Sequence, residues 1–353
     1  MASMFRRAAF AVALAFGMRA APPRQVDVYR AGDGEYHTYR IPALVVTAKG
    51  TLLAFCEGRR NSAADSGDID IVLRRSFDGG STWGPMQTVA DAGSDTIGNP
   101  TAVVERKTGA VILLMTRNPG GMAERDIGEN DRTVWIARST DDGATWSPPA
   151  EITAQVKRPG WTWYATGPGN GIQLRGGRLV IPCDHNVGRT ERHSHVIYSD
   201  DRGVTWKIGG VAEENTNESA VVQLKSGELV LNMRSYHGKN RRAVQRSRDG
   251  GLTWSPLSLD DALIEPVCQA SMIAAGKLVF FANPAATTRT NLAVRLSRDG
   301  ARTWSEPRTV WPGPSAYSSL ALLKSGAVGL LYESGDRSPN ERIAFALVMN
   351  LTN

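Results

Sequence analysis

The residues best suited to chemistry in this chain are a set of arginines, carboxylates and one tyrosine, each beside the start or end of a strand-like run. They are Arg40, Arg59, Arg234, Arg289, Asp65, Glu218, Glu333 and Tyr317. An arginine presents a planar fork of donors that matches a carboxylate with two hydrogen bonds. Carboxyl and phenol groups beside such a fork can transfer protons or attack a substrate. If these side chains meet in the fold, they form a pocket for an anion with acid and base groups beside it.

A repeated eight-residue box is the first clue to the elements that position these residues. The pattern Ser-x-Asp-x-Gly-x-Thr-Trp occurs at 76–83, 139–146, 199–206, 247–254 and 297–304, with Ala301 replacing the glycine in the fifth copy. Each box follows a strand-like run. The Asp side chain can bond backbone N–H groups across a tight turn, Gly permits a positive φ, and the Trp can pack between neighbouring units. The boxes therefore predict structural turns rather than catalytic groups.

A second repeat, an apolar run followed by glycine and another apolar run, alternates with the boxes. Its glycines are Gly50, Gly109, Gly177, Gly227, Gly276 and Gly326. One unit then consists of a strand, a Gly turn, a second strand, a loop, a third strand, a box turn and a fourth strand. Six such units predict an all-β fold, a six-bladed β-propeller with four-stranded antiparallel blades. The sixth unit lacks a box, and the strand at 26–30 would supply its fourth strand.

This topology assigns the turns to faces of the molecule. The Gly hairpins and the boxes fall on one face, so residues before the first strand or after the second strand of a unit gather on the other. Arg40, Glu218 and Tyr317 precede first strands. The remaining candidates, from Arg59 to Glu333, follow second strands. We therefore expect all of them to converge around the axis on the face opposite the boxes.

Several longer motifs give the chain a family resemblance. They are Arg40-Ile41-Pro42, the boxes, and the segments at 55–76 (FCEGRRNSAADSGDIDIVLRRS), 164–174 (YATGPGNGIQL), 217–224 (NESAVVQL), 232–235 (NMRS), 283–289, 316–320 (AYSSL) and 330–333 (LLYE). Over nearly all of residues 26–350 the chain resembles the bacterial exo-α-sialidases (neuraminidases). Asp boxes alone are weak evidence because they also occur in propellers that are not enzymes. The Arg-Ile-Pro motif together with the ordered Asp, Glu, three Arg and Tyr is specific.

The resemblance implies a binding role for five of the candidate residues. Arg40, Arg234 and Arg289 would form the triad that binds the carboxylate of a sialic acid. Glu333 would hold Arg40 in place. Arg59 would line the pocket near the substituents of the sugar ring. The implied partners are sialylated glycans, and no cofactor or metal is implied.

The resemblance also implies a catalytic role for three residues. Tyr317 would be the nucleophile, Glu218 its base partner and Asp65 the general acid and base. Sialic acid carries its carboxylate on the anomeric carbon, so a carboxylate nucleophile would meet a like charge at short range, whereas a neutral phenol would not. The implied reaction is release of terminal α-linked sialic acids from glycoproteins, glycolipids or oligosaccharides, with retained configuration. A glycosidase for a deaminated or otherwise modified nonulosonic acid, a trans-sialidase and a non-catalytic glycan-binding propeller remain alternatives.

Composition limits the other function classes. The chain has 353 residues, 41% of them hydrophobic and 22% charged, with a formal net charge of +6. This composition excludes a disordered chain and a fibre. The basic excess contains no run of Lys and Arg typical of nucleic-acid binding, so it favours an anionic small ligand over nucleic acid.

Cysteines and histidines predict no metal site. Cys56, Cys183 and Cys268 are odd in number and far apart, which argues against a disulfide framework and against zinc. We expect them to be buried in the core. We place His193 and His195 on opposite sides of one strand, which would prevent them from sharing a metal.

The N-terminus predicts an export signal. Arg6 and Arg7 precede an apolar run at 8–18, which is too short to span a bilayer and fits a signal peptide over residues 1–21. Residues 22–353 would form the propeller domain. We therefore expect a secreted or periplasmic protein without stable membrane insertion.

Two further groups fall on the face of the candidate site and are hypothetical sugar contacts: Trp161, Trp163 and Tyr164, and Met115, Arg117 and Asn118. The aromatic group would stack on a sugar ring or cap a loop. The second group would line an acyl pocket.

Overall fold

Strands make up nearly all the regular structure of the computed structural model, which describes residues 25–350. Within that range the helical segments are η1 (Glu124–Asp126) and α1 (Thr153–Val156). The prediction of an all-β fold is confirmed. The predicted signal peptide lies outside the described residues. Over residues 25–350, no helix has the length and apolar character needed to cross a membrane.

Antiparallel pairing groups the strands into six consecutive sets of four. The first two sets are β2 (Thr38–Val46), β3 (Leu52–Arg59), β4 (Ile69–Ser76) and β5 (Gln87–Ala90), then β6 (Thr96–Val104), β7 (Val111–Asn118), β8 (Thr133–Ser139) and β9 (Ala150–Glu151). A single bridge between Ile69 and Thr96 joins them into one sheet. The inner strand of the third set is broken, and its pieces are β10 (Trp161–Thr166), β11 (Gly169–Asn170) and β12 (Ile172–Gln173). The rest of that set is β13 (Leu179–Val187), β14 (Glu191–Ser199) and β15 (Lys207–Glu214).

The remaining sets follow the same order along the chain. The fourth is β16 (Thr216–Gln223), β17 (Leu229–Ser235), β18 (Arg241–Ser247) and β19 (Ser258–Ile264). The fifth is β20 (Ser271–Ala275), β21 (Leu278–Pro284), β22 (Thr290–Ser297) and the first half of β23 (Arg308–Leu322). The second half of β23 begins the sixth set, which continues with β24 (Ala327–Ser334), β25 (Arg342–Asn350) and β1 (Gln25–Arg30). The predicted pairing of the N-terminal strand with the last unit is confirmed, since Val26 lies opposite Phe345.

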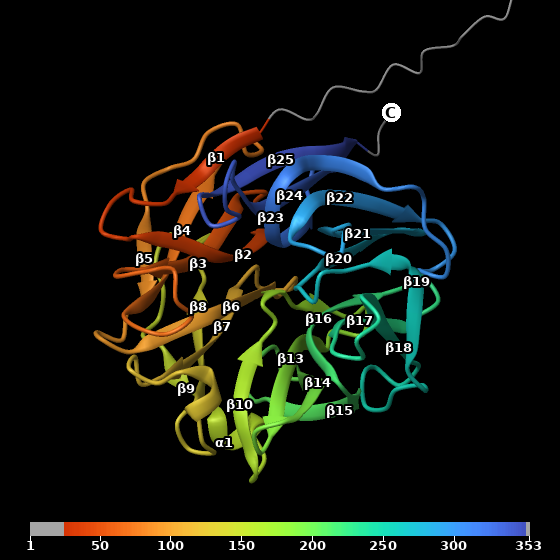
Figure 1. The fold of residues 1–353 in the computed structure, drawn as a ribbon, viewed down its shortest axis with the longest axis horizontal. Coiled ribbons are helices and arrows are strands. Elements are labelled where there is room, and N and C mark those ends of the chain that lie inside the picture. Colours follow the sequence, from red (N-terminus) through yellow and green to blue (C-terminus); the bar gives the residue numbers. More distant parts are fainter. Residues whose placement is uncertain (1–24, 351–353) are drawn as a thin grey trace, which may run out of the picture.

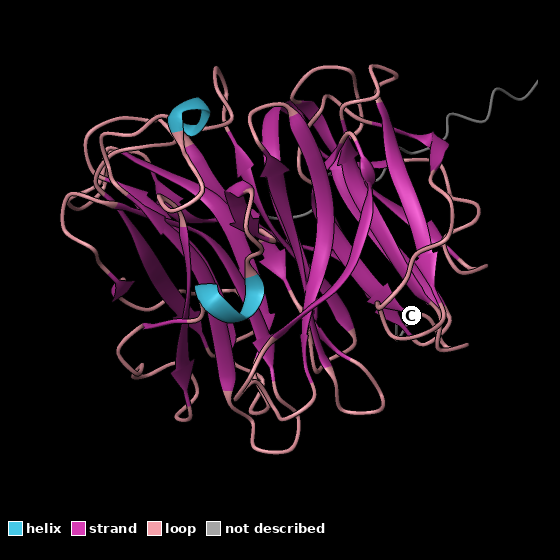
Figure 2. Cartoon of the chain, turned by 90° about the horizontal axis from the view of Figure 1, so that it is seen from below, coloured by secondary structure: helices cyan, strands magenta, loops and turns pink. Residues whose placement is uncertain are grey.

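The sets follow one another around a common centre, in sequence order (Figure 1). The strands run between two faces, and loops and turns lie at both ends (Figure 2). The inner and middle strands are apolar because both of their sides are covered: all eight residues of β3 are buried. One core cluster joins Phe55 of β3 to Ala102 and Met115 of the next set, so the core lies between neighbouring sets. The three cysteines are free and buried, as predicted.

The boxes form the turns between third and fourth strands and join neighbouring sets. In the second box, Asp141 Oδ1 accepts hydrogen bonds from Ser139 Oγ and from the backbone N–H of Thr145, both at 2.9 Å. Its other oxygen accepts from Thr145 Oγ1 at 2.5 Å. Trp146 packs edge-on against Phe55 of the preceding set, with ring centroids 5.5 Å apart. These contacts confirm a structural role for the box.

Replacing Asp141 by alanine is expected to lower stability with little effect on catalysis. The side chain is exposed, so the lost hydrogen bonds should cost about 1–2 kcal/mol of unfolding free energy. In a chain of this size that lowers Tm by roughly 1–3 °C. The measurement is thermal unfolding, with Thr140→Ala, at an exposed neighbouring position, as control. A large loss of kcat with an unchanged Tm would contradict the assignment of the boxes to the face opposite the site.

The histidine prediction is wrong. Residues two apart on a strand point to the same side, and His193 and His195 both pack against His185, with ring centroids 5.5 and 4.7 Å away. His185 Nδ1 lies 3.0 Å from His195 Nδ1, and Trp161 stacks on the His185 ring. Burial lowers the pKa of His185 to about 3, which keeps it neutral. In residues 25–350 no cluster of three or more His, Cys, Asp or Glu side chains is arranged to hold a metal.

Candidate active site

The predicted site residues meet at one end of the inner strands, around a cavity of about 140 Å³. The candidates that line this pocket are Arg40, Arg59, Asp65, Glu218, Arg234, Arg289 and Tyr317. The eighth, Glu333, is fully buried behind Arg40. Residues almost 300 positions apart in the sequence therefore contribute to one site, as the alternation of hairpins and boxes predicts.

Irregularities in the inner strands aim several of these side chains. The pairing of β2 with β3 shifts register between Arg40 and Ala43, and Ile41, one of the two residues in between, has a φ of 61°. Such a φ is rare for a β-branched residue. The register also shifts around Glu218 in β16 and around Tyr317 in β23. A bulge re-aims the side chain at its position, so each irregular strand turns its functional residue toward the centre.

Tyr317 and Glu218 are in direct contact in the pocket. Tyr317 Oη donates a hydrogen bond to Glu218 Oε1 at 2.6 Å. Arg234 Nη1 donates to Glu218 Oε2 at 2.8 Å and lies 3.4 Å from Tyr317 Oη. Burial and the nearby Glu218 carboxylate raise the pKa of Tyr317 well above 10. At neutral pH the tyrosine is thus a neutral phenol whose proton already points at a base.

Arg40 is held rigidly by Glu333. Arg40 Nε and Nη2 each donate to one oxygen of Glu333, both at 3.1 Å. The same carboxylate accepts from the backbone N–H groups of Ile41, at 2.9 Å, and Tyr317, at 3.1 Å. Glu333 thereby fixes the arginine and the tyrosine relative to each other. Arg40 Nη1 lies 3.4 Å from Asp65 Oδ1, so one hydrogen of Nη1 and the second hydrogen of Nη2 remain for an anion in the pocket.

Three guanidinium groups surround the phenol ring. The Cζ atoms of Arg40 and Arg289 lie 5.1 and 5.7 Å from the centroid of Tyr317, and Arg234 contacts its oxygen. Over residues 25–350, Arg289 has no carboxylate within 4 Å. The positive charge around Tyr317 is therefore incompletely balanced, which suits the binding of an anion at this point.

Asp65 lies at the mouth of the pocket, with its side chain 70% exposed. Its Oδ1 is 2.7 Å from Arg59 Nη1 and 3.4 Å from Arg40 Nη1. Partial burial alone would raise the pKa of Asp65, but the guanidinium groups of Arg59 and Arg40 outweigh that effect and lower the pKa below its ordinary value. In the free site Asp65 is therefore an ionised carboxylate at neutral pH.

The predicted residue Arg59 has lining neighbours that were not predicted from the sequence: Glu57, Asn99 and Arg132. Arg59 Nε and Nη2 donate to Glu57 Oε2 at 3.0 and 2.6 Å. The other oxygen of Glu57 accepts from the backbone N–H of Asn99, a residue with a φ of 55°. Arg132 is buried beneath the pocket and donates to the side chains of Asn99, Asn118 and Thr116 and to the backbone of Tyr164. Hydrogen bonds from Arg59 to Glu57, from Asn99 to Glu57 and from Arg132 to Asn99 hold Arg59 in position.

Asp184 also lines the pocket and was not predicted from the sequence. Its Oδ2 accepts from Trp163 Nε1 at 3.1 Å and from Asn217 Nδ2 at 2.8 Å. Its Oδ1 is buried without a partner among the described residues. Burial, together with the carboxylates of Glu218 and Glu124, raises the pKa of Asp184 well above its ordinary value. This carboxyl can offer a hydrogen bond to a polar group of a bound ligand.

Of the additional residues expected to contact a sugar, only Trp163 is among those that line the pocket. Trp163 lines the pocket and stacks over Arg132, with Cζ 3.8 Å from the ring centroid. Trp161 and Tyr164 are buried. The expectation for the second group is wrong: Met115 belongs to the core between sets, Arg117 pairs with Asp95 at 2.9 Å, and Asn118 binds Arg132.

Comparison with known proteins agrees with this geometry. Residues 50–330 match the family model of the BNR repeat-like domain. An exo-alpha-sialidase of Aspergillus fumigatus is 31% identical, and the match covers 90% of this chain and 83% of that protein. The chain belongs to the sialidase family. Its family resemblance, predicted from the motifs, is confirmed.

Other family members differ from this chain in length. A sialidase of Bacteroides fragilis is 37% identical over 88% of this chain, which spans 62% of that protein. A solved structure, the Hadza microbial sialidase Hz136, superposes with a TM-score of 0.86 at 35% identity, covering 93% of this chain and 68% of that one. The chain thus spans about half to three fifths of the length of the bacterial curated relatives it matches.

Proposed function

We propose that this family member is an exo-α-sialidase that releases terminal α-linked sialic acids from glycans with retained configuration. The observation that supports this most directly is the 2.6 Å hydrogen bond from Tyr317 to Glu218 inside a cluster of three guanidinium groups. Glycosidases generally pair two carboxylates, and sialidases with a tyrosine nucleophile are an exception. A site that binds an anionic sugar beside a neutral phenol fits the exception.

In the proposed reaction Tyr317 Oη forms a bond to the anomeric carbon as the bond to the leaving-group oxygen breaks. Glu218 takes the phenolic proton during the attack. Asp65 gives a proton to the leaving oxygen, then removes one from the water that attacks the anomeric carbon. In that second step the bond from the anomeric carbon to Tyr317 Oη breaks, and Glu218 returns its proton to the phenolate. The carboxylate of the sugar would lie among Arg40, Arg234 and Arg289, which keeps the anomeric carbon against the phenol.

Binding of the substrate should itself prepare Asp65 to act as an acid. Asp65 is ionised in the free site because of the neighbouring guanidinium groups. A substrate carboxylate on Arg40 offsets part of that positive charge and adds a negative charge nearby. Both changes raise the pKa of Asp65, so the protonated form becomes more populated in the complex than in the free enzyme.

This predicts a difference between two pH profiles. Activity that needs protonated Asp65 is lost as the pH rises through its pKa, and kcat/KM reports the free enzyme whereas kcat reports the complex. The alkaline limb of kcat is therefore expected at higher pH than the alkaline limb of kcat/KM. Initial rates measured from about pH 2.5 to 8 test this, because the pKa of Asp65 in the free site lies below its ordinary value. If the two alkaline limbs coincide, or if the limb of kcat lies at the lower pH, then substrate binding does not raise the pKa of Asp65.

We also propose that the six sets of strands close into a six-bladed β-propeller that forms one domain over residues 22–353. The pairing of β1 with β25 supports this, because it joins the first described strand to the last. The predicted signal peptide supports a secreted or periplasmic location, which fractionation of cells producing the full chain would test.

The activity is tested with α-linked fluorogenic N-acetylneuraminide and its deaminated analogue. Release of fluorophore from the first supports the proposal, and release only from the second would point to a glycosidase for the deaminated sugar. The polar wall around Asp184 makes the second outcome worth testing, since its free oxygen suits a hydroxyl group. No release from either, by folded protein, would refute the proposed activity.

A further inference from the structure

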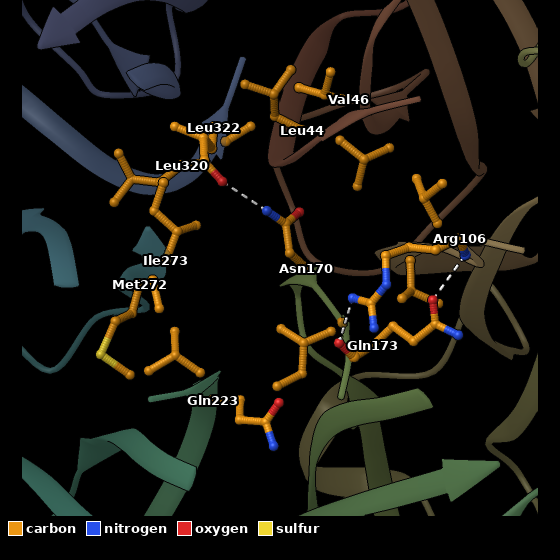
Figure 3. A pocket seen from close by; sticks show the side chains of 18 of the residues that line it. Leu44, Val46, Arg106, Asn170, Gln173, Gln223, Met272, Ile273, Leu320 and Leu322 are labelled. Atoms are coloured by element: carbon orange, nitrogen blue, oxygen red, sulfur yellow. Dashed lines mark hydrogen bonds between the residues drawn. The ribbon is translucent and has the colours of Figure 1, made fainter. Parts of the chain in front are cut away.

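A second cavity, larger than the catalytic pocket, lies at the opposite ends of the inner strands. Its volume is about 610 Å³, within the range of small-molecule sites. Each of the six sets contributes to its wall, through Leu44, Val103, Ile172, Val222, Met272 and Leu320. Figure 3 shows three of them, Leu44, Met272 and Leu320, around a shared space on separate strands.

The two cavities are separate although the same strands build both. On β16, Glu218 lines the catalytic pocket and Val222, four residues later, lines the second cavity. Four residues of extended chain span about 13 Å. The two cavities share no lining residue. In the wall of the second cavity, Asn170 Nδ2 donates to the backbone oxygen of Leu320 at 2.8 Å (Figure 3), and Ser319 Oγ donates to Asn170 Oδ1 at 3.2 Å. A ligand in the second cavity would not reach Tyr317.

The wall presents unfilled apolar surface. Val46, Val104, Ile172 and Ile273 are only partly buried, and Leu322 is 40% exposed. Surface of this kind gains free energy when an apolar group covers it. A volume of about 610 Å³ has room for a single alkyl chain among the inner strands.

The mouth of the cavity is strongly basic. Its cationic side chains are Arg106, Arg175, Lys225 and Lys277. Within the part of the chain that the structure describes, no carboxylate lies within 4 Å of any of these four cationic groups. The nearby Glu105 carboxylate is buried and accepts hydrogen bonds from its own turn and from Gln173. The mouth therefore carries excess positive charge.

Two of these cations are held in place by backbone oxygens. Arg106 donates to the carbonyl oxygens of Gln173, at 2.8 Å, and Leu174, at 2.6 Å. Arg175 donates to those of Leu224, at 3.0 Å, and Lys225, at 3.2 Å. Neutral acceptors orient the guanidinium groups without cancelling their charge, so an anion at the mouth meets cations that are already ordered.

We propose that this cavity binds a single-chain anionic amphiphile, of which a long-chain fatty carboxylate is the simplest form. The apolar chain would lie along the wall and the carboxylate would lie among the cations at the mouth. An apolar wall alone would accept any hydrophobic chain, and a basic mouth alone would accept any anion. Their combination selects a ligand with both parts, and this site is independent of the reaction at Tyr317.

Calorimetric titration with dodecanoate, below its micelle concentration, tests the proposal. We expect saturable binding of one dodecanoate per chain. Dodecyltrimethylammonium, which has the same chain and the opposite charge, should bind roughly tenfold more weakly or worse. Butanoate, which has the carboxylate but almost no chain, should not bind measurably.

Two kinds of variant test separately how the basic mouth and the apolar wall contribute to dodecanoate binding. Reversing two exposed cations, Lys225→Glu with Lys277→Glu, should weaken dodecanoate binding roughly tenfold or more. Ala274→Trp should fill the cavity and abolish binding. The matched control is Lys207→Glu with Lys239→Glu, two exposed lysines outside the cavity, which should bind as the unaltered chain does.

Circular dichroism and thermal unfolding establish that each variant is folded. The charge reversal involves only exposed residues, so the test does not depend on the Ala274 variant being folded. Three results would overturn the proposal: no binding of dodecanoate, equal binding by the charge-reversed variant and its control, or equal affinity for the cationic and anionic amphiphiles.

Discussion

Tyr317→Phe is expected to remove most of the proposed sialidase activity while leaving the fold intact. Phenylalanine keeps the ring and its packing between Arg40 and Arg289 but lacks the oxygen that would attack the anomeric carbon. Loss of a covalent nucleophile should reduce kcat on an unactivated sialoside roughly 100-fold or more. The backbone N–H of Tyr317 still donates to Glu333, so the site should keep its shape.

A matched control shows whether the loss is chemical. Tyr332 is also buried and donates its hydroxyl to Gln25 Oε1 at 2.7 Å, away from the pocket. Tyr332→Phe removes a buried hydroxyl too, so it should lower stability by a similar small amount and keep its activity. An equal fall in kcat for both variants would mean that the effect at Tyr317 is structural.

Glu218→Gln should also be severe, because an amide cannot accept the phenolic proton. If Tyr317 and Glu218 act as one unit, the double variant should be scarcely worse than the worse single variant. A double variant whose loss equals the product of the two single losses would show that the residues act independently.

Covalent labelling identifies the attacking atom directly. A fluorinated sialic acid that forms the intermediate but is hydrolysed slowly should add its mass to the peptide that contains Tyr317. Glu218 is 2.6 Å from Tyr317 Oη in space but 99 positions away in the sequence, so a label on either residue falls on a different peptide. Label on Glu218 or Asp65 would reassign the nucleophile.

The positions of the main functional residues could be predicted because they depend on connectivity. Hairpin glycines alternate with boxes, so the order of turns determines which residues reach each end of the strands. Arg40, Glu218 and Tyr317 precede predicted strands and do meet in the pocket. The register shifts beside them could not be predicted, because pairing between strands depends on tertiary contacts that no local pattern specifies.

The missed residues had a weaker signal. Arg132 directly precedes β8 and Asp184 lies in the second half of β13, so the topological rule places both at the end where the pocket lies. Nothing in their local sequence indicates burial.

The ionised state of Asp65 could not be predicted from the sequence either, because it depends on the 2.7 Å contact between Asp65 and Arg59. The prediction for His193 and His195 was wrong for a simpler reason: residues two apart on a strand point to the same side, not to opposite sides.

Arg40→Lys is expected to weaken substrate binding strongly. Lysine keeps the positive charge but cannot form two parallel hydrogen bonds to a carboxylate. In the free site Arg40 already donates two hydrogen bonds to Glu333, so its guanidinium group must bind Glu333 and the substrate carboxylate at the same time. A lysine ammonium cannot bind both carboxylates with paired hydrogen bonds. Losing the charge-assisted pair should cost at least ~2 kcal/mol, roughly thirtyfold in kcat/KM.

Steady-state kinetics with Arg40→Lys should show this loss mainly as a higher KM, because the carboxylate is bound both before and during the reaction. Arg178→Lys is the matched control: Arg178 makes the same two-donor contact with Asp200, at 2.8 and 3.1 Å, outside the pocket. That variant should keep its kcat/KM. Glu333 should stay in place in Arg40→Lys, because the backbone N–H groups of Ile41 and Tyr317 still bind it. A fully active Arg40→Lys enzyme would exclude Arg40 from the carboxylate site, leaving Arg234 and Arg289 to bind the anion alone.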